Sequence, residues 1–181
     1  MTDISQIMVL GVGNILFTDE GFGIRVIEKL QSEYDFPENV SVVDGGVLGM
    51  NLLGVISEAD QLIVVDVIRN NGEPGTLYRI DNDDIPQRIR AKNSLHQIDF
   101  LEAMTFCRYG LDKVPEAVIF GVEPRDIETC CLDLTPLIHS RIDDMTEKVL
   151  EELTRLGVSY KKKGAAEHVS CHSLKNCGNH Q

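Results

Sequence analysis

The stretch GVGNILFTDEGFGIRVIEKL, residues 11–30, places a carboxylate where a buried strand passes into a helix. The apolar run IMVLGVG, residues 7–13, ends in glycine, as a buried first strand does. Apolar residues then recur at helical spacing, at Phe22, Val26, Ile27 and Leu30. Asp19 is a suitable N-cap for this helix, and Glu20 falls in its first turn, where the helix dipole favours an ionised carboxylate. In open α/β sheets, ligands bind at such junctions.

Further apolar runs predict the other strands. Three of them are typical of buried strands: residues 40–43, which end in Asp44, residues 62–68 and residues 117–122. Residues 76–80 follow the turn signal NNGEPG and are predicted as an edge or paired strand.

Helical patterns separate these strands. They cover residues 48–57, residues 98–107 and a last helix that begins at Thr135, has Pro136 at its first position and ends at Gly157. The alternation of strands and helices predicts an α/β fold with a largely parallel sheet and helices on both faces.

Length and charge limit the kinds of protein that this chain can be. It has 181 residues, and we expect a single α/β domain over residues 1–160. The formal net charge of −12 argues against a nucleic-acid partner, because binding a phosphate backbone needs clustered Lys and Arg. The start MTDISQIMVLGVG lacks the basic residues of a secretory signal, and the composition does not suggest a membrane span. We therefore expect a cytoplasmic protein without nucleic-acid or membrane partners.

Residues 161–181 are predicted to form a flexible tail that contains Cys and His. Five of the ten Cys and His side chains lie in it: His168, Cys171, His172, Cys177 and His180. Such a cluster suits a soft metal, but its spacing differs from paired CxxC zinc modules and the segment has little apolar content. The odd number of five cysteines, without the spacing of a secreted framework, indicates reduced thiols.

Three side chains from distant positions are candidates for one metal site. Glu20 follows the first strand, Asp66 closes the run LIVV, and His96 precedes a helical segment. Each also has an ordinary structural alternative: a favourable charge at a helix start, a turn cap and a surface histidine. However, the ends of parallel strands gather side chains into one crevice, which favours a shared site. A Glu/Asp/His set suits Zn, Ni, Mn or Fe, with coordination positions left open for substrate.

The opening GVG also begins like a dinucleotide-binding fingerprint. The third glycine of GxGxxG would fall at Leu16, and Asp44 lies well beyond the offset of about 20 residues expected for a ribose contact. The GK[ST] ending of a P-loop is missing as well. A nucleotide-binding α/β enzyme is therefore a minor alternative.

Five motifs, in this order and spacing, resemble one known family. They are GVGNILFTDEGFGIRV at 11–26, DGGVLGMNLL at 44–53, IVVDVI around Asp66, SLHQ around His96 and GVEP at 121–124. Over about residues 7 to 156, the chain resembles the NiFe-hydrogenase maturation endopeptidases.

This resemblance implies both a fold and a reaction. The implied fold is a three-layer α/β sandwich with a twisted, mostly parallel sheet between helices. The implied reaction is removal of a short C-terminal extension from the NiFe-hydrogenase large-subunit precursor after nickel insertion. The family's metal-contacting Glu, Asp and His correspond to Glu20, Asp66 and His96 of this chain. The nickel is then expected to arrive with the substrate, and other divalent ions such as Zn or Cd are expected to bind in vitro.

The implied arrangement has the properties of a proofreading device. If the three side chains complete the coordination of nickel that the substrate already holds, only a loaded precursor gains the extra binding energy. The resemblance leaves open whether the peptidase is metal-dependent, metal-recognising or aspartyl-type.

Asp44, the acid of the DGG motif, is a candidate general base, and Gly45 and Gly46 are candidates for contact with the substrate backbone. A strand-ending turn is the structural alternative for these three residues. The alternative function is a non-enzymatic nickel-binding chaperone that holds the metal on its tail.

Overall fold

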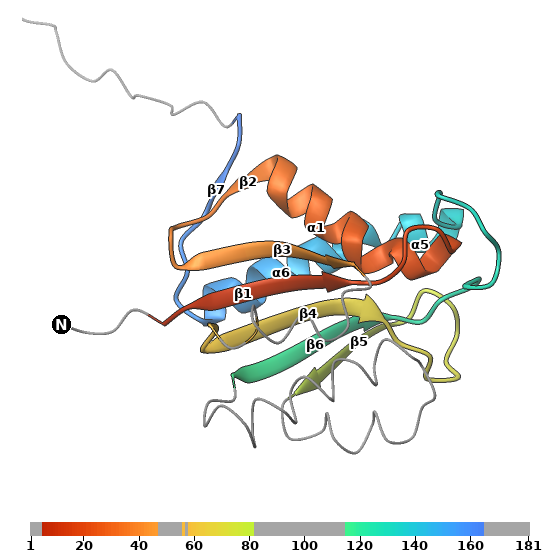
Figure 1. Ribbon diagram of the computed structural model, residues 1–181, viewed down its shortest axis with the longest axis horizontal. Coiled ribbons are helices and arrows are strands. Elements are labelled where there is room, and N and C mark those ends of the chain that lie inside the picture. Colours follow the sequence, from red (N-terminus) through yellow and green to blue (C-terminus); the bar gives the residue numbers. More distant parts are fainter. Residues whose placement is uncertain (1–4, 47–55, 57, 82–114, 165–181) are drawn as a thin grey trace, which may run out of the picture.

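The computed structural model describes residues 5–46, 56, 58–81 and 115–164. Its main sheet has five strands in the order β3-β1-β4-β6-β5 (Figure 1). Four strands are parallel, namely β1 (Ile7–Val12), β3 (Val40–Gly46), β4 (Gln61–Val67) and β6 (Glu116–Val122), whereas β5 (Leu77–Asp81) is antiparallel to β6. The 3₁₀ turn η1 (Thr18–Gly21) and helix α1 (Phe22–Glu33) follow β1, and α5 (Pro136–His139) and α6 (Ile142–Arg155) follow β6. Among the described residues, no helix is both long enough and apolar enough to cross a membrane.

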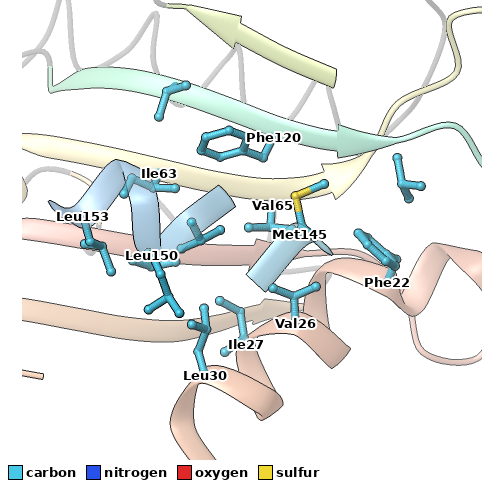
Figure 2. Close-up of a cluster of buried hydrophobic side chains, with 14 of the residues drawn as sticks. Phe22, Val26, Ile27, Leu30, Ile63, Val65, Phe120, Met145, Leu150 and Leu153 are labelled. Carbon is cyan, nitrogen blue, oxygen red and sulfur yellow. The ribbon is translucent and has the colours of Figure 1, made fainter. Parts of the chain in front are cut away.

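The central strands of the sheet, β1, β4 and β6, are buried on both faces. All six residues of β1 are buried, as expected for a parallel strand that is covered on both sides. On one face, α1 and α6 pack against β1, β4 and β6 through an apolar core (Figure 2) that includes Phe22, Ile27, Ile63, Phe120, Met145 and Leu153. On the other face, Leu10, Val64 and Ile119 form a second apolar cluster with Ile56. The predicted mostly parallel α/β sheet is therefore confirmed.

Two of the predicted helices lie almost entirely outside the described residues. They are residues 48–57, of which Ile56 is described and is helical and buried, and residues 98–107.

The predicted last helix is interrupted, so its continuity is wrong. Pro136 does stand at the first helical position, but the chain forms α5, a turn at 140–141 and then α6. In the turn, the Ser140 hydroxyl donates a hydrogen bond to Leu137 O at 2.7 Å, and Arg141 N donates to Ile138 O, three residues back, at 3.0 Å. The bond from Arg141 N reaches back three residues in place of the four of an α-helix, and this tighter turn separates α5 from α6.

The end of this last helix agrees with the sequence. Gly157 follows α6 with φ +83°, a conformation that suits glycine and stops the helix as predicted.

A small second sheet ties the chain beyond α6 to the domain. Strand β7 (Lys161–Lys162) pairs antiparallel with β2 (Tyr34–Asp35), and Lys163 N donates to Glu33 O at 2.7 Å. Tyr160 packs edge-on against Tyr34, with ring centroids 5.7 Å apart. Residues 161–164, predicted as the start of the tail, therefore pack with the domain. The rest of the predicted tail lies outside the described residues.

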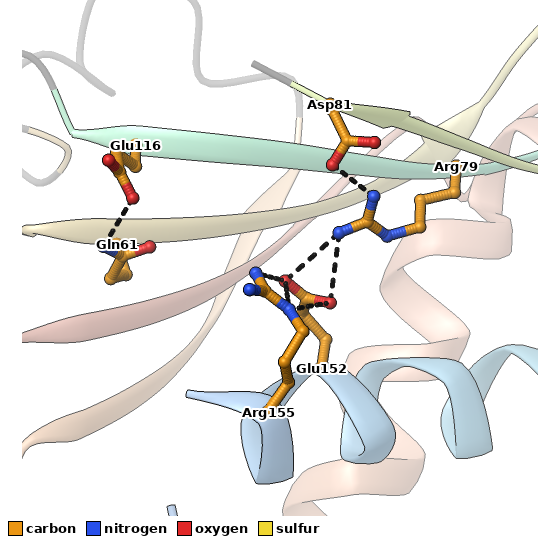
Figure 3. Close-up of polar contacts among 6 residues, drawn as sticks. All are labelled: Gln61, Arg79, Asp81, Glu116, Glu152 and Arg155. Carbon is orange, nitrogen blue, oxygen red and sulfur yellow. Dashed lines mark hydrogen bonds and ion pairs between the residues drawn. The ribbon is translucent and has the colours of Figure 1, made fainter. Parts of the chain in front are cut away.

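A polar network occupies the edge of the sheet where the parallel strands begin (Figure 3). The buried carboxylate of Glu152 accepts hydrogen bonds from Arg155 Nε at 3.1 Å and from Arg79 Nη2 at 3.3 Å. These hydrogen bonds, that of Arg155 foremost, hold the pKa of Glu152 below its usual range although burial acts in the opposite direction. Gln61 Nε2 donates a hydrogen bond to Glu116 Oε2 at 3.0 Å, and these two residues are the first of β4 and β6. This network is a stabilising feature of the edge opposite the candidate site.

Strands β1 and β4 define the topological switch point of the sheet. From β1 the chain passes through α1 to β3 on one side of β1, and β4 lies on the other side. In a doubly wound sheet with this order, the ligand crevice opens at the carboxyl ends of the two strands where the order reverses. Glu20 follows β1 and Asp66 lies near the end of β4, so both lie at the edge of the sheet where this rule predicts a ligand crevice.

Gly23, in the first turn of α1, sets the distance between the helix and the sheet. A Cβ at this position would lie 2.3 Å from Val65 O and 2.4 Å from Val12 O. We expect Gly23→Ala to lower the free energy of unfolding by about 3 kcal/mol, because α1 must move away from the strand ends. Urea denaturation measures this loss.

Gly157→Ala is the matched control, because its positive φ costs about 1 kcal/mol while nothing lies within 4 Å of its Cβ. An equal loss of unfolding free energy in the two variants would contradict the close packing at Gly23.

Candidate metal centre and active site

Two candidate carboxylates flank the end of β1. In the sheet register, Gly11 of β1 pairs with Asp44 of β3 on one side and with Val65 of β4 on the other. Asp66 is the next residue of β4. The fold therefore brings Asp44 and Asp66, which are distant in sequence, to the same edge of the sheet.

Glu20 reaches this edge from η1, which directly precedes α1. The prediction that Glu20 lies in the first turn of α1 is wrong, because α1 begins at Phe22. Glu20 N donates a hydrogen bond to Phe17 O at 2.8 Å, and Glu20 O accepts one from Asn14 N at 3.2 Å, so the loop closes on itself. Gly13 permits this close passage, since a Cβ there would lie 1.9 Å from Glu20 O. The turn η1 also contacts β4, the strand that carries Asp66.

The predicted N-cap, Asp19, has a different role. It is fully buried, and its side chain does not cap α1. Its Oδ2 accepts hydrogen bonds from the N–H groups of Arg125 at 2.9 Å and Asp126 at 2.8 Å, and its Oδ1 accepts one from Thr135 N–H at 2.8 Å. The Thr135 hydroxyl donates to Oδ2 at 3.2 Å. The capping prediction is therefore wrong, and Asp19 instead fixes η1 to the loop between β6 and α5.

The same loop holds Thr18 in a strained conformation. Thr18 has φ +36°, which is unusual for a β-branched residue. Its N–H donates to Cys131 O at 2.9 Å, and its hydroxyl donates to Thr129 O at 2.6 Å. Such strain costs about 1–3 kcal/mol and persists only where the surroundings fix the backbone. The loop that follows β6 therefore sets the backbone from which Glu20 projects.

Asp66 has the perturbed electrostatics of a functional carboxylate. Its side chain is buried, with the residue only 8% exposed. Burial raises the pKa of Asp66 from 3.8 to about 7; the hydrogen bond from Val67 N–H to Oδ1, at 2.7 Å, opposes this rise, and the charge of Glu20 adds to it. The two carboxylates are thus close enough to repel each other. A divalent cation between them would offset both the repulsion and the burial of charge.

Asp44 lies within β3, two residues before its end, and pairs with Gly11 of β1, so the structural alternative of a turn after the strand is wrong for this residue. Its Oδ1 accepts a hydrogen bond from Gly46 N–H at 2.9 Å, and Gly46 has φ +47°. Gly45 packs closely on β1, because a Cβ there would lie 2.9 Å from Gly11 O. The Asp44 residue is nevertheless exposed, so its carboxylate remains accessible to water at the edge of the crevice.

The third predicted metal ligand, His96, lies outside the described residues. Within the part of the chain that the structure describes, no group of three or more His, Cys, Asp or Glu side chains could hold a metal ion. Glu20 and Asp66 supply two oxygen donors, and an imidazole such as that of His96 would complete a mixed set suited to a borderline divalent ion. Cys130 and Cys131 are free and exposed.

Glu123, the acid of the GVEP motif, has a positioning role that the sequence analysis did not assign. It directly follows β6 and is buried. Its Oε2 accepts hydrogen bonds from Asn70 N–H at 2.7 Å and from the Tyr78 hydroxyl at 2.8 Å, so it holds the segment after β4 against β5. The available signal was an acid at a strand end, the same signal that identified Asp66.

Known proteins share both the sequence and the fold. The model of the hydrogenase maturation protease family matches residues 24–152. Hydrogenase expression/formation protein HupD of Bradyrhizobium diazoefficiens is 37% identical over 163 residues, which cover 89% of this chain and 84% of that protein. Hydrogenase 2 maturation protease of Escherichia coli K12 is 35% identical over 154 residues, which cover 84% of this chain and 93% of that protein. The solved structure of the hydrogenase maturating endopeptidase HybD from E. coli matches with a TM-score of 0.83 at 35% identity, over 87% of this chain and 98% of that one.

These similarities, together with the sheet topology, define a hydrolase of the endopeptidase class with a mostly parallel α/β fold. The chain belongs to the hydrogenase maturation protease family. The family that the five sequence motifs indicated is therefore confirmed.

Asp19→Asn tests the anchor of η1. The amide has the same shape as the carboxylate, but its NH2 group can only donate. At least one of the buried backbone N–H groups therefore loses its acceptor. We expect the free energy of unfolding to fall by about 2 kcal/mol and the amide protons of Arg125 and Thr135 to exchange faster. Asp133→Asn, an exposed change in the same loop, is the control and should stay within about 0.5 kcal/mol of wild type. An Asp19→Asn protein as stable and as protected as this control would refute the anchor.

Asp66→Asn tests the raised pKa of the buried carboxylate. Because its pKa is about 7 in the fold and near 3.8 when unfolded, the folded protein binds more protons between these pH values. The contribution of Asp66 to stability therefore falls as pH rises from about 4 to about 7. The neutral amide avoids this loss, so we expect the stability of Asp66→Asn relative to wild type to increase by roughly 2–3 kcal/mol between pH 5 and pH 8.

Urea denaturation in metal-free buffer with a chelator measures this difference at both pH values. Asp44→Asn is the exposed control. A stability difference between Asp66→Asn and wild type that does not change with pH would show that Asp66 titrates normally.

Proposed function

We propose that this endopeptidase removes the C-terminal extension of the NiFe-hydrogenase large-subunit precursor after nickel has been inserted. The proposal is supported by the positions of Glu20, in the turn after β1, and of buried Asp66, near the end of β4, and by the membership of the chain in the hydrogenase maturation protease family. The relative from E. coli K12 is named a hydrogenase 2 maturation protease, which supports this class of substrate. The proposed location is the cytoplasm, in agreement with the free, exposed thiols of Cys130 and Cys131.

In this proposal, Glu20, Asp66 and His96 recognise the nickel that the precursor brings. Asp66 is poorly suited to stand ionised beside Glu20 without a cation, because burial and the neighbouring charge both favour its protonated form. A nickel ion held by the substrate supplies the missing positive charge and finds open ligands in the crevice. A nickel-free precursor lacks this contribution, so cleavage is coupled to nickel insertion. Zinc or cadmium is proposed to occupy the same ligands in vitro.

Asp44 is proposed to activate the water that attacks the scissile peptide bond. Its Oδ1 accepts the Gly46 N–H, which fixes the orientation of the carboxylate, and its exposure allows contact with water. Gly45 and Gly46, beside it, are proposed to let the substrate backbone approach this edge.

The alternative of a nucleotide-binding enzyme is disfavoured. Glu20 lies at the turn where a dinucleotide would place its pyrophosphate, and the negative charge of Glu20 disfavours binding of this anionic group.

Processing assays with nickel-loaded and nickel-free precursor test this function. We expect C-terminal mass loss, measured by mass spectrometry, only in the loaded precursor. We expect Glu20→Gln, Asp66→Asn and His96→Gln to slow processing about 100-fold or more, because each removes a ligand to the ion. Glu147→Gln, an exposed change on α6, is the control.

Far-ultraviolet circular dichroism and thermal melting establish that each variant is folded. Equal processing of loaded and nickel-free precursor would remove nickel recognition from the proposal. Absence of processing of either precursor by the wild type would refute the proposed substrate.

A further inference from the structure

Exposed apolar side chains gather beside Glu20. The exposed large apolar residues of the described part of the chain are Ile15, Leu16, Phe17 and Leu132, with 38%, 53%, 37% and 57% of their surface accessible. Three of them lie in the loop after β1 that leads into η1, and Leu132 lies in the loop between β6 and α5. We call these four residues the apolar patch. Concentrated exposed apolar surface of this kind marks a site of interaction with another macromolecule.

Backbone pairing joins the two segments that form the apolar patch. Phe17 and Cys131 form an isolated parallel bridge, with Cys131 N donating to Leu16 O at 3.0 Å and Thr18 N donating to Cys131 O at 2.9 Å. Arg25 Nη2 of α1 donates to Leu132 O at 2.9 Å. The patch is therefore held in place before a partner arrives, which lowers the entropic cost of binding.

The apolar patch connects the candidate metal centre to a groove. Phe17 O accepts the hydrogen bond from Glu20 N, so the patch adjoins the turn that carries Glu20. Leu132 also lines an open groove of about 930 Å³ that runs beside α1, α5 and the start of α6. Charged side chains line the groove, among them Arg25, Lys29 and Asp143. An apolar centre with a polar border is the usual composition of a protein–protein interface.

Size and charge favour a transient partner over a second copy of this chain. At these exposed fractions, the four side chains offer on the order of 300 Å², well below the ~800 Å² per partner of a standard stable interface. Two copies would each carry a formal net charge of −12 and repel each other. An enzyme must also release its product, which suits a small contact.

We propose that the apolar patch docks the folded body of the large-subunit precursor, through apolar side chains of the precursor next to its cleaved segment. This inference rests on the proposed function and adds to it the surface that selects the protein around the nickel. The patch contributes to substrate binding, whereas Glu20 and Asp66 act on the ion. Loss of the apolar patch therefore raises KM and leaves kcat unchanged.

The double variant Leu16→Ser/Leu132→Ser tests the docking surface. Both side chains are about half exposed, so the changes leave the core intact. With a nickel-loaded precursor that the wild type processes, we expect KM to rise roughly 10- to 30-fold and kcat to stay within about two-fold. The double variant Glu38→Ser/Glu147→Ser, which changes two exposed residues outside the patch and the groove, is the matched control and should keep the wild-type KM.

Three outcomes would overturn the docking surface while the wild type still processes the precursor. They are an unchanged KM, a fall in kcat without a rise in KM, and a wild-type dimer in sedimentation velocity that the double Leu variant converts to a monomer. The last would show that a second copy covers the patch. If the wild type itself processes no loaded precursor, the proposed function fails and the precursor is no longer the occupant.

Discussion

The buried carboxylate of Asp19 is the interaction on which the candidate site depends. It accepts hydrogen bonds from the backbone of Arg125, Asp126 and Thr135, residues that the chain reaches only after completing β6. A buried carboxylate without donors would be strongly unfavourable, so the bonds that Asp19 accepts stabilise the contact between these two segments. The hydrogen bonds of Asp19 therefore also fix the position of the neighbouring Glu20. The anchor thus separates two roles within one Asp-Glu pair: Asp19 fixes the turn and Glu20 faces the crevice.

The same geometry explains the unusual electrostatics of the crevice. Strands β1 and β4 end side by side at the switch point, and η1 carries Glu20 against β4. Asp66 is therefore buried next to a second carboxylate, and its pKa rises to about 7. In the proposed function, a cation bound between the two carboxylates would offset the unfavourable burial and repulsion of their charges.

The sequence predicted the sheet well because buried parallel strands leave a simple pattern. The run IMVLGVG predicted a strand at 7–13, and β1 spans Ile7–Val12; the acids near the ends of β3 and β4 followed from the same runs. The predictions were wrong where the local structure depends on contacts that are distant in sequence or on single hydrogen bonds. Asp19 is a reasonable helix cap by local criteria, but its hydrogen-bond partners lie more than 100 positions away. The turn at 140–141 likewise depends on a bond from Arg141 N to Ile138 O that no apolar periodicity reveals.

Anomalous X-ray diffraction from crystals of the full chain grown with zinc tests the proposed metal site. We expect one ion bound jointly by the carboxylates of Glu20 and Asp66 and by the imidazole of His96, at ligand distances of about 2.0–2.2 Å. A zinc ion held only by the cysteines and histidines after residue 167, with the crevice between β1 and β4 empty, would contradict it.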